Sequence, residues 1–190
     1  MLAMPFFHRV TGDRLDRPFP SSETIYLAMG CFWGAEKLFW NTDGVLQTAV
    51  GMGGLTPNPI YHEVCTGCTG HAETVRVTYD PNQVSTEAIL TVFLENHDPT
   101  QGMRQSNDVG TQYRSAIWCT TTEQFMTATT VKGSFQANLL NAGYGAITTA
   151  ISMANGVEFY LAEAEHQQYL EDNPFGYCPV HATGVCLAGS

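Results

Sequence analysis

The sequence predicts a two-layer α+β protein, in which helices pack against a sheet of roughly four or five strands. Two observations lead to this fold class. Short β-rich runs and segments of helical periodicity follow one another in mixed order along the chain. The chain also has 190 residues, of which 44% are hydrophobic, and this is enough to bury a substantial core.

The first predicted strand covers Thr24–Met29, because the run TIYLAM is β-rich and ends at Gly30. The run WGAEKLFW has helical spacing of its apolar residues and predicts a helix over Trp33–Trp40. Cys31 therefore lies where a strand turns into a helix.

The middle of the chain continues with alternating elements. Residues 45–50 predict a second strand, and the run GMGGLTPNP at 51–59 predicts a loop because it is rich in Gly and Pro. Alternation of apolar residues predicts a third strand over 74–79. Ser85 is a suitable N-cap for a helix that runs through Asn96.

The second half adds further elements before periodicity ends. Thr120 and Glu123 form a capping-box pattern for a helix toward Leu140, although Gly133 weakens it. The other predicted elements are a strand at 113–118, β-like segments at 146–153 and 158–161, and a short helix at 162–170.

The chain is predicted to consist of an extended arm at 1–20 and one folded domain at 21–190, which includes an aperiodic tail at 173–190. The start of the chain lacks the apolar core of a signal peptide, so we expect a cytoplasmic protein. The net charge of −10 argues against binding to nucleic acid or to an anionic membrane. No apolar run approaches the ~20 residues that span a bilayer.

Cys31 is a candidate nucleophile, because backbone N–H groups and the positive end of the helix dipole favour a thiolate at this position. A buried structural cysteine is the alternative, since free cysteine is among the most buried residue types. Phe32 and Trp33 follow directly and would suit a pocket for a small apolar group, although core packing explains such a pair more often. Glu73 could donate a proton if an aromatic wall keeps it neutral, or it could be an exposed carboxylate at the end of a strand.

Cys65 and Cys68 have CxxC spacing, and His62 and His71 flank them. A zinc site is one interpretation, but four ligands in so short a segment are more compact than the usual two separated pairs. A thioredoxin-type redox pair is another, although no helix begins clearly at Cys65.

A cysteine hydrolase also stays open, with Cys31 as nucleophile and His71 or His97 as base. Cys119 lies at the end of a predicted strand and is interpreted as structural.

Successive blocks of the sequence resemble the A-type peptide methionine sulfoxide reductases, in the same order, over about residues 24–187. The blocks are GCFWGAEKLFW at 30–40, NPIYHEVCTGCTGHAETVRVTYDP at 58–81, ENHDPTQGMRQSNDVGTQYRSAI at 95–117, AEHQQYL at 164–170, and GYC followed by GVC at 176–186. The resemblance implies a ferredoxin-like α+β sandwich (an α/β roll) with a long coil tail at the C-terminus. It also implies repair of oxidative damage by reduction of methionine-S-sulfoxide, free or in proteins, to methionine.

The resemblance further implies roles for individual residues. Cys31 would attack the sulfoxide sulfur and become a sulfenic acid, and Glu73 would protonate or hydrogen-bond the sulfoxide oxygen. The residues that would bind substrate are Phe32 and Trp33 at the methyl group, Tyr61 and Tyr113 at the oxygen, and Asp108 on the polar side of the pocket.

The two tail cysteines match the three-cysteine recycling subtype of that family. Cys178 would attack Cys31, and Cys186 would then attack Cys178, which leaves a disulfide for thioredoxin or another dithiol to reduce. The resemblance implies neither a bound cofactor nor a metal. It also has a departure, because Met52 stands in a shortened GMGG where the family commonly has a tyrosine.

Overall fold

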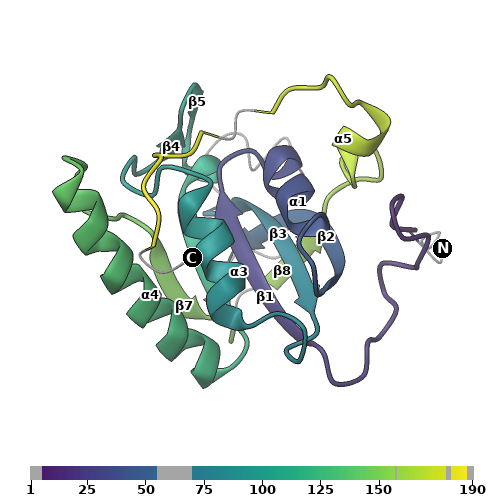
Figure 1. Ribbon diagram of the computed structural model, residues 1–190. Helices are drawn as coiled ribbons and strands as arrows, with labels where there is room; N and C mark the ends of the chain where they lie inside the picture. Colours follow the sequence, from purple (N-terminus) through teal and green to yellow (C-terminus); the bar gives the residue numbers. More distant parts are fainter. Residues whose placement is uncertain (1–5, 55–69, 157, 179–180, 188–190) are drawn as a thin grey trace.

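A computed structural model describes residues 6–54, 70–156, 158–178 and 181–187. The fold is α+β and contains a mixed sheet of six strands and a separate two-stranded hairpin, β4–β5 (Figure 1). The elements are β1 (Glu23–Met29), α1 (Phe32–Trp40), β2 (Val45–Gly54), β3 (Ala72–Tyr79), α3 (Thr86–Glu95), β4 (Arg104–Gln105), β5 (Asp108–Val109), the 3-10 helix η1 (Thr111–Tyr113), β6 (Ser115–Cys119), α4 (Thr122–Asn141), β7 (Ala150–Met153), β8 (Glu158–Leu161) and α5 (Tyr169–Asp172).

The six-stranded sheet has the order β7-β6-β1-β3-β2-β8. Neighbouring strands are antiparallel, except that β6 and β7 run parallel. β1 is therefore a central strand, and its end delivers the chain directly into α1 at Cys31. The sequence predicted this strand and this helix to within one residue, because the strand is a β-rich run closed by Gly30 and the helix has apolar residues at helical spacing.

The main core lies between the sheet and helices α1, α3 and α4, which cover one face (Figure 1). Ile25, Leu27 and Met29 of β1 point into this core, whereas Ala28 belongs to a smaller cluster on the opposite face with Trp118. This alternation is the period of two that a strand with two covered faces requires. None of the described helices is long and apolar enough to cross a membrane.

Helix caps explain where α3 and α4 begin. Ser85 accepts a hydrogen bond from the backbone N–H of Ala88, as predicted. For α4 the predicted capping residue was wrong by one position, because Thr121 caps the helix through Gln124. Thr120 instead donates its hydroxyl to the carbonyl of Thr24 in β1, so the helix begins one residue later than expected.

Two predicted elements were wrong. Residues 51–54 are not a loop but extend β2, which pairs there with both β3 and β8. Glycine is needed at this point because a Cβ at Gly51 would collide with the carbonyl oxygen of Tyr160, and one at Gly54 would lie 2.6 Å from the ring of His71. The helix predicted over 162–170 is mostly turn, and only Tyr169–Asp172 is helical.

The arm predicted as extended folds back on itself within its described part, residues 6–20. Phe7 and Arg14 form an isolated antiparallel bridge, and the backbone N–H of His8 donates to the carbonyl of Asp13. Leu15 and His8 are buried, so this segment packs against the body of the protein rather than extending into solvent.

Candidate active site

A cavity of about 120 Å³ opens where β1 meets α1. Its walls come from four stretches of the chain: the β1–α1 junction, β3, the segment from β5 to η1, and the tail. The lining residues are Cys31, Phe32, Trp33, Glu73, Asp108, Tyr113 and Tyr177. All of them except Tyr177 are candidates from the sequence, so the fold places residues far apart in the chain around one small space.

Cys31 is the N-cap residue of α1 and is 9% exposed. Burial raises the pKa of its thiol to about 12, and the negative charges of Glu73 and Asp108 act in the same direction. The backbone N–H groups of Trp33 and Gly34 oppose this shift, as expected at the start of a helix. The expectation of a stabilised thiolate was therefore wrong, because desolvation of the thiol outweighs the effect of the helix terminus.

Glu73 lies on β3, is only 2% exposed, and reaches across to the start of α1. Its Oε2 accepts a hydrogen bond of 3.0 Å from the backbone N–H of Phe32, the residue that follows Cys31. The carboxyl group is thus held beside the thiol inside the cavity, and it is not the exposed strand-end carboxylate that the sequence left open.

Aromatic rings build the apolar wall. Phe32 is buried, and the ring of Trp33 stacks on Tyr169 with centroids 4.0 Å apart and planes 20° apart. His166 lies 5.8 Å from Trp33 and 5.7 Å from Phe32, centroid to centroid. The position of Phe32 and Trp33 in the wall therefore depends on His166 and Tyr169, which pack behind these rings and do not line the cavity themselves. The sequence did not reveal this support, because it arises from contacts between distant parts of the chain.

The polar wall is formed by Asp108 at the start of β5 and Tyr113 at the end of η1. The sequence reasoning missed Tyr177, whose hydroxyl donates a hydrogen bond of 3.0 Å to Asp108 Oδ1. The available signal was its position in GYC, directly before Cys178.

The tail cysteines lie outside the cavity lining, and both Cys178 and Cys186 are exposed. Residues 183–187 are fixed against α4 and the turn after it, because Asn138 donates to the carbonyl of Cys186 and Tyr144 to that of Thr183, each at 2.9 Å. They are also fixed against α3, because the backbone N–H of Leu187 donates to Glu95 Oε1 at 2.6 Å. Cys31, Cys119, Cys178 and Cys186 are all free thiols, and Cys119 is buried on β6, as expected for a structural cysteine.

Several candidates fall outside the described residues, namely Tyr61, His62, Cys65 and Cys68. Within the residues that the structure describes, no three His, Cys, Asp or Glu side chains gather as a metal-binding group. The described lining of the cavity contains no histidine. His97 instead is buried between the carbonyl of Phe93 and the hydroxyl of Ser115, which removes it as the base of a hydrolase acting through Cys31.

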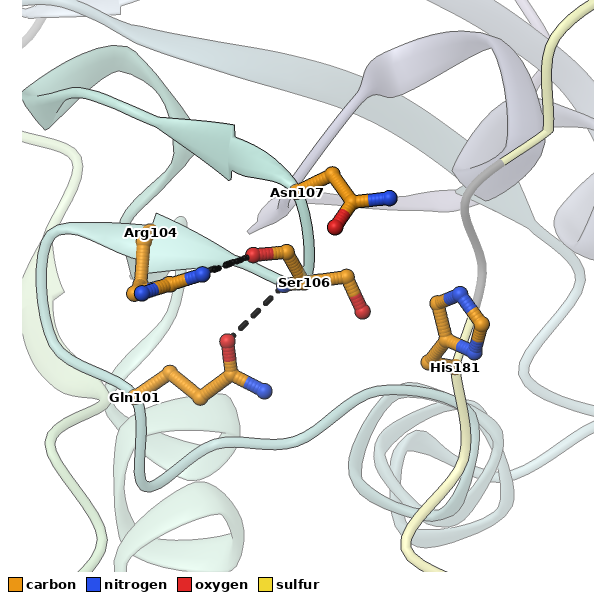
Figure 2. A pocket seen from close by; sticks show the side chains of 5 residues that line it. All are labelled: Gln101, Arg104, Ser106, Asn107 and His181. Atoms are coloured by element: carbon orange, nitrogen blue, oxygen red, sulfur yellow. Dashed lines mark hydrogen bonds between the residues drawn. The ribbon is translucent and has the colours of Figure 1, made fainter.

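A second cavity of about 620 Å³ lies between the β4–β5 hairpin and the tail. Figure 2 shows His181 across this cavity from Arg104, which donates to the carbonyl of Ser106. Its described lining is polar and holds no cysteine or carboxylate, the complete set being Gln101, Arg104, Ser106, Asn107 and His181. The smaller cavity is therefore the candidate active site.

Comparison with known proteins gives a consistent result. The family model described as peptide methionine sulfoxide reductase matches residues 23–186. The chain is 56% identical over 190 residues to the peptide methionine sulfoxide reductase MsrA of Corynebacterium kroppenstedtii, covering 97% of this chain and 86% of that protein.

Solved structures agree with these matches. Methionine sulfoxide reductase A of Corynebacterium diphtheriae is 50% identical, with a TM-score of 0.86 and coverage of 96% of this chain and 89% of that one. Mxr1 from Saccharomyces cerevisiae in complex with Trx2 shares the fold at 21% identity, with a TM-score of 0.58 and coverage of 88% of this chain and 94% of that one.

Proposed function

The chain belongs to the peptide methionine sulfoxide reductase family, and from this premise we propose that Cys31 is the residue that takes the oxygen atom from methionine sulfoxide. The protein is an enzyme that reduces methionine sulfoxide and so repairs oxidised proteins. We propose the S epimer as its substrate, either free or within a protein chain.

The chemical step at Cys31 transfers one oxygen atom. The Cys31 sulfur attacks the sulfoxide sulfur, and its thiol proton passes to the Glu73 carboxylate and from there to the sulfoxide oxygen, because that oxygen is a poor leaving group until it is protonated. The sulfur–oxygen bond of the substrate breaks as the hydroxyl group transfers to the Cys31 sulfur. Methionine leaves, and Cys31 is left as a sulfenic acid. The position of Glu73 beside the thiol supports its role.

The remaining lining residues hold the substrate. We propose that Phe32 and Trp33 contact the methyl group, that Tyr113 binds the sulfoxide oxygen and that Asp108 supports the polar side of the pocket. For Tyr61, which lies outside the described residues, we propose the same role as for Tyr113. The cavity of about 120 Å³ suits a methyl sulfoxide group and little more, which supports a small substrate head with its chain outside.

Recycling proceeds through the tail as a three-cysteine mechanism. The Cys178 thiol attacks the sulfenic sulfur of Cys31 and releases water, and the Cys186 thiol then attacks Cys178, which frees Cys31 and leaves a Cys178–Cys186 disulfide. The contact of Tyr177 with Asp108 supports this order, because it brings the backbone beside Cys178 to the cavity.

The reductant of that disulfide is proposed to be thioredoxin or another dithiol, and the reaction needs no bound cofactor. The exposure of both tail cysteines supports access by a protein partner. For the fold we propose the ferredoxin-like class, with residues 21–190 as one catalytic domain. The elements β1, α1, β2, β3, α3 and β6 follow in this order, with the short elements β4, β5 and η1 between α3 and β6. This order and the strand order β6-β1-β3-β2 support the class.

The observation that carries the proposed mechanism is the single cavity shared by Cys31, Glu73 and Tyr177. Titration of free thiols before and after addition of methionine sulfoxide, with no reductant present, tests it. We expect the loss of two thiols for each methionine formed. A hydrolase or a metal-binding module would lose none, and that result would overturn the proposal.

A further inference from the structure

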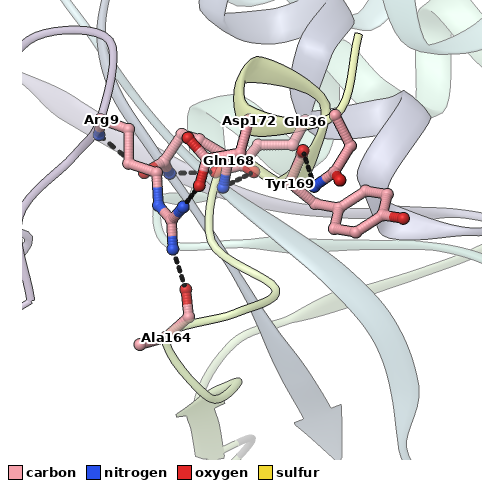
Figure 3. Close-up of polar contacts among 7 residues, drawn as sticks. Arg9, Glu36, Ala164, Gln168, Tyr169 and Asp172 are labelled. Carbon is pink, nitrogen blue, oxygen red and sulfur yellow. Dashed lines mark hydrogen bonds and ion pairs between the residues drawn. The ribbon is translucent and has the colours of Figure 1, made fainter. Parts of the chain in front are cut away.

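Glu36 is the buried charge that the proposed mechanism leaves unused. It lies on α1, the helix that begins at Cys31, and its side chain is fully buried. Both carboxylate oxygens are engaged by Gln168: the backbone N–H of Gln168 donates to Oε2 at 2.8 Å, and the side-chain amide donates to Oε1 at 2.6 Å (Figure 3). Glu36 therefore binds a segment that is distant in sequence from its own helix.

Gln168 holds an unusual backbone conformation. Its φ is 46° and its ψ is 41°, in the left-handed region that non-glycine residues rarely adopt. Such a conformation costs of order 1 kcal/mol or more and persists only where the surroundings impose it. The two hydrogen bonds to Glu36 hold Gln168 in this place, and a residue with left-handed φ and ψ cannot continue a right-handed helix through position 168.

Tyr169, the residue after Gln168, connects the backbone conformation of Gln168 to the wall of the cavity. Gln168 is the N-cap of α5, so its conformation sets the direction in which Tyr169 leaves the backbone. The ring of Tyr169 stacks on Trp33, and Trp33 lines the cavity. The indole nitrogen of Trp33 is buried and has no hydrogen-bond partner among the described residues, so ring stacking is a main contact that orients it.

Residues of the N-terminal arm also contact the Glu36–Gln168 pair. Thr11 N–H donates to Nδ1 of His8, so Nε2 carries the proton and donates to Thr48, whose hydroxyl in turn donates to Glu36 Oε1 at 3.1 Å. Arg9 contributes its backbone N–H to Gln168 Oε1 and forms an ion pair with Asp172 (Figure 3). All three donors at Glu36 suit a carboxylate, although burial raises the pKa of Glu36 to about 7.

We propose that Glu36 is a positioning residue for the methyl side of the substrate pocket, acting through Gln168 and Tyr169 on Trp33. The proposal rests on the proposed role of Trp33 in holding substrate. Glu36 does not line the cavity and so contacts neither the substrate nor the Cys31 sulfur. Its effect is therefore on the binding of substrate through the position of Trp33, and the rate of attack by Cys31 does not depend on it.

The variant Glu36→Gln tests the proposal. Its amide can still accept from Thr48 and from the Gln168 side chain, but its NH₂ group would face the backbone N–H of Gln168, so that one bond is lost. We expect KM for methionine sulfoxide to rise about two- to tenfold, the range that ring stacking is worth. The single-turnover rate at saturating substrate should stay within about twofold, since Cys31 and Glu73 keep their places.

Three further variants make the test specific. Tyr169→Leu should raise KM by a similar factor, and adding Glu36→Gln to it should change KM no further, because both act through one contact. Thr48→Val removes a donor to Glu36 but leaves both Gln168 bonds, so KM should stay unchanged even if the protein loses stability. Trp33→Leu reports on the pocket itself and should raise KM.

The outcomes separate the two proposals. If Trp33→Leu raises KM while Glu36→Gln does not, or if the effects of Glu36→Gln and Tyr169→Leu multiply, the positioning role is overturned and the pocket stands. If Trp33→Leu leaves KM unchanged, the proposed pocket fails and the positioning role fails with it. A rise in KM for Thr48→Val equal to that for Glu36→Gln would show general loosening of the fold and would also overturn the positioning role.

Discussion

The hydroxyl of Tyr177 donates a hydrogen bond to Asp108 Oδ1, and this bond ties the tail to the polar wall of the cavity that holds Cys31. Tyr177 itself is 48% exposed, so the tail crosses the mouth of the cavity without being buried there. This hydrogen bond therefore links the cavity around Cys31 to the residue before Cys178, the cysteine that is proposed to attack the sulfenic acid of Cys31.

Tyr177→Phe removes this bond and keeps the ring. We expect methionine release to be unchanged and the Cys31–Cys178 disulfide to form more slowly, by roughly fivefold for a hydrogen bond worth about 1 kcal/mol. Quenched-flow measurement of methionine and of free thiols in one turnover separates the two steps. Tyr144→Phe loses a bond at the other end of the tail and serves as the matched control. Equal rates for Tyr177→Phe and the wild type would contradict the positioning of Cys178 by this contact.

The cysteines divide into three expected phenotypes. Cys31→Ser should abolish turnover, because a hydroxyl cannot accept the oxygen atom as a sulfenic acid. Cys186→Ser should release one equivalent of methionine and then recycle poorly with thioredoxin. Cys119→Ala, at a buried site outside the cavity, should keep its activity and lose about 1 kcal/mol of stability. Mass spectrometry of the quenched thiols and a steady-state assay check all three. Normal turnover by Cys31→Ser would exclude the mechanism.

Glu73→Gln separates two effects of the same carboxyl group. Removing the negative charge should lower the pKa of Cys31, since Glu73 is the second cause of its elevation. The loss of the group that passes the thiol proton to the sulfoxide oxygen should nevertheless slow the chemical step about 10²- to 10³-fold. Cys31 should therefore be alkylated faster by iodoacetamide while sulfoxide reduction falls. Glu87→Gln, at an exposed site on α3, is the control. A variant with an unchanged rate of reduction would exclude Glu73 as the acid.

The burial of His97 is expected to make the free energy of unfolding depend on pH. Burial lowers the pKa of its ring from 6.5 to about 4. Between these values the unfolded chain binds a proton that the folded protein does not, so His97 makes the free energy of unfolding decrease as pH falls from 6.5 to 4. Glu36 acts in the opposite direction, because burial raises its pKa in the folded protein from the ordinary value of 4.5 to about 7.

The ring resonances of His97 in NMR spectra give the direct test. They should show no titration between pH 7 and pH 5, and His97→Asn should have a shallower decrease of the free energy of unfolding over pH 6.5 to 4 than the wild type. A ring that titrates near its ordinary pKa would contradict the burial of a neutral His97.

Much of the fold could be predicted because its signals are local. The strand ending at Met29 was found from a β-rich run closed by Gly30, the helix ending at Trp40 was found from apolar periodicity, and Ser85 was found as a cap from residue type and position. The extension of β2 over 51–54 was missed because glycines usually indicate a loop, and only the packed neighbours show why they stand in a strand.

The site was predictable to a different degree. The residues around Cys31 were selected through resemblance to a family, since neither Glu73 nor Asp108 is distinctive in its own stretch of sequence. The direction of the pKa shift at Cys31 was wrong, because sequence places the helix terminus but does not give the depth of burial. The short hairpin β4–β5 and the left-handed Gln168 depend on long-range contacts and had no local signal.

The resting state of Cys31 has a consequence for survival of the enzyme under oxidative stress. Oxidants in solution must reach a sulfur before they can react with it, and Cys31 lies inside a small cavity with only 9% of its surface exposed. The two tail thiols are exposed, so they are more accessible to such oxidants than the nucleophile is. Oxidation of the two tail thiols can give a disulfide between them, and a dithiol reductant converts that disulfide back to thiols. Damage at the tail is therefore reversible.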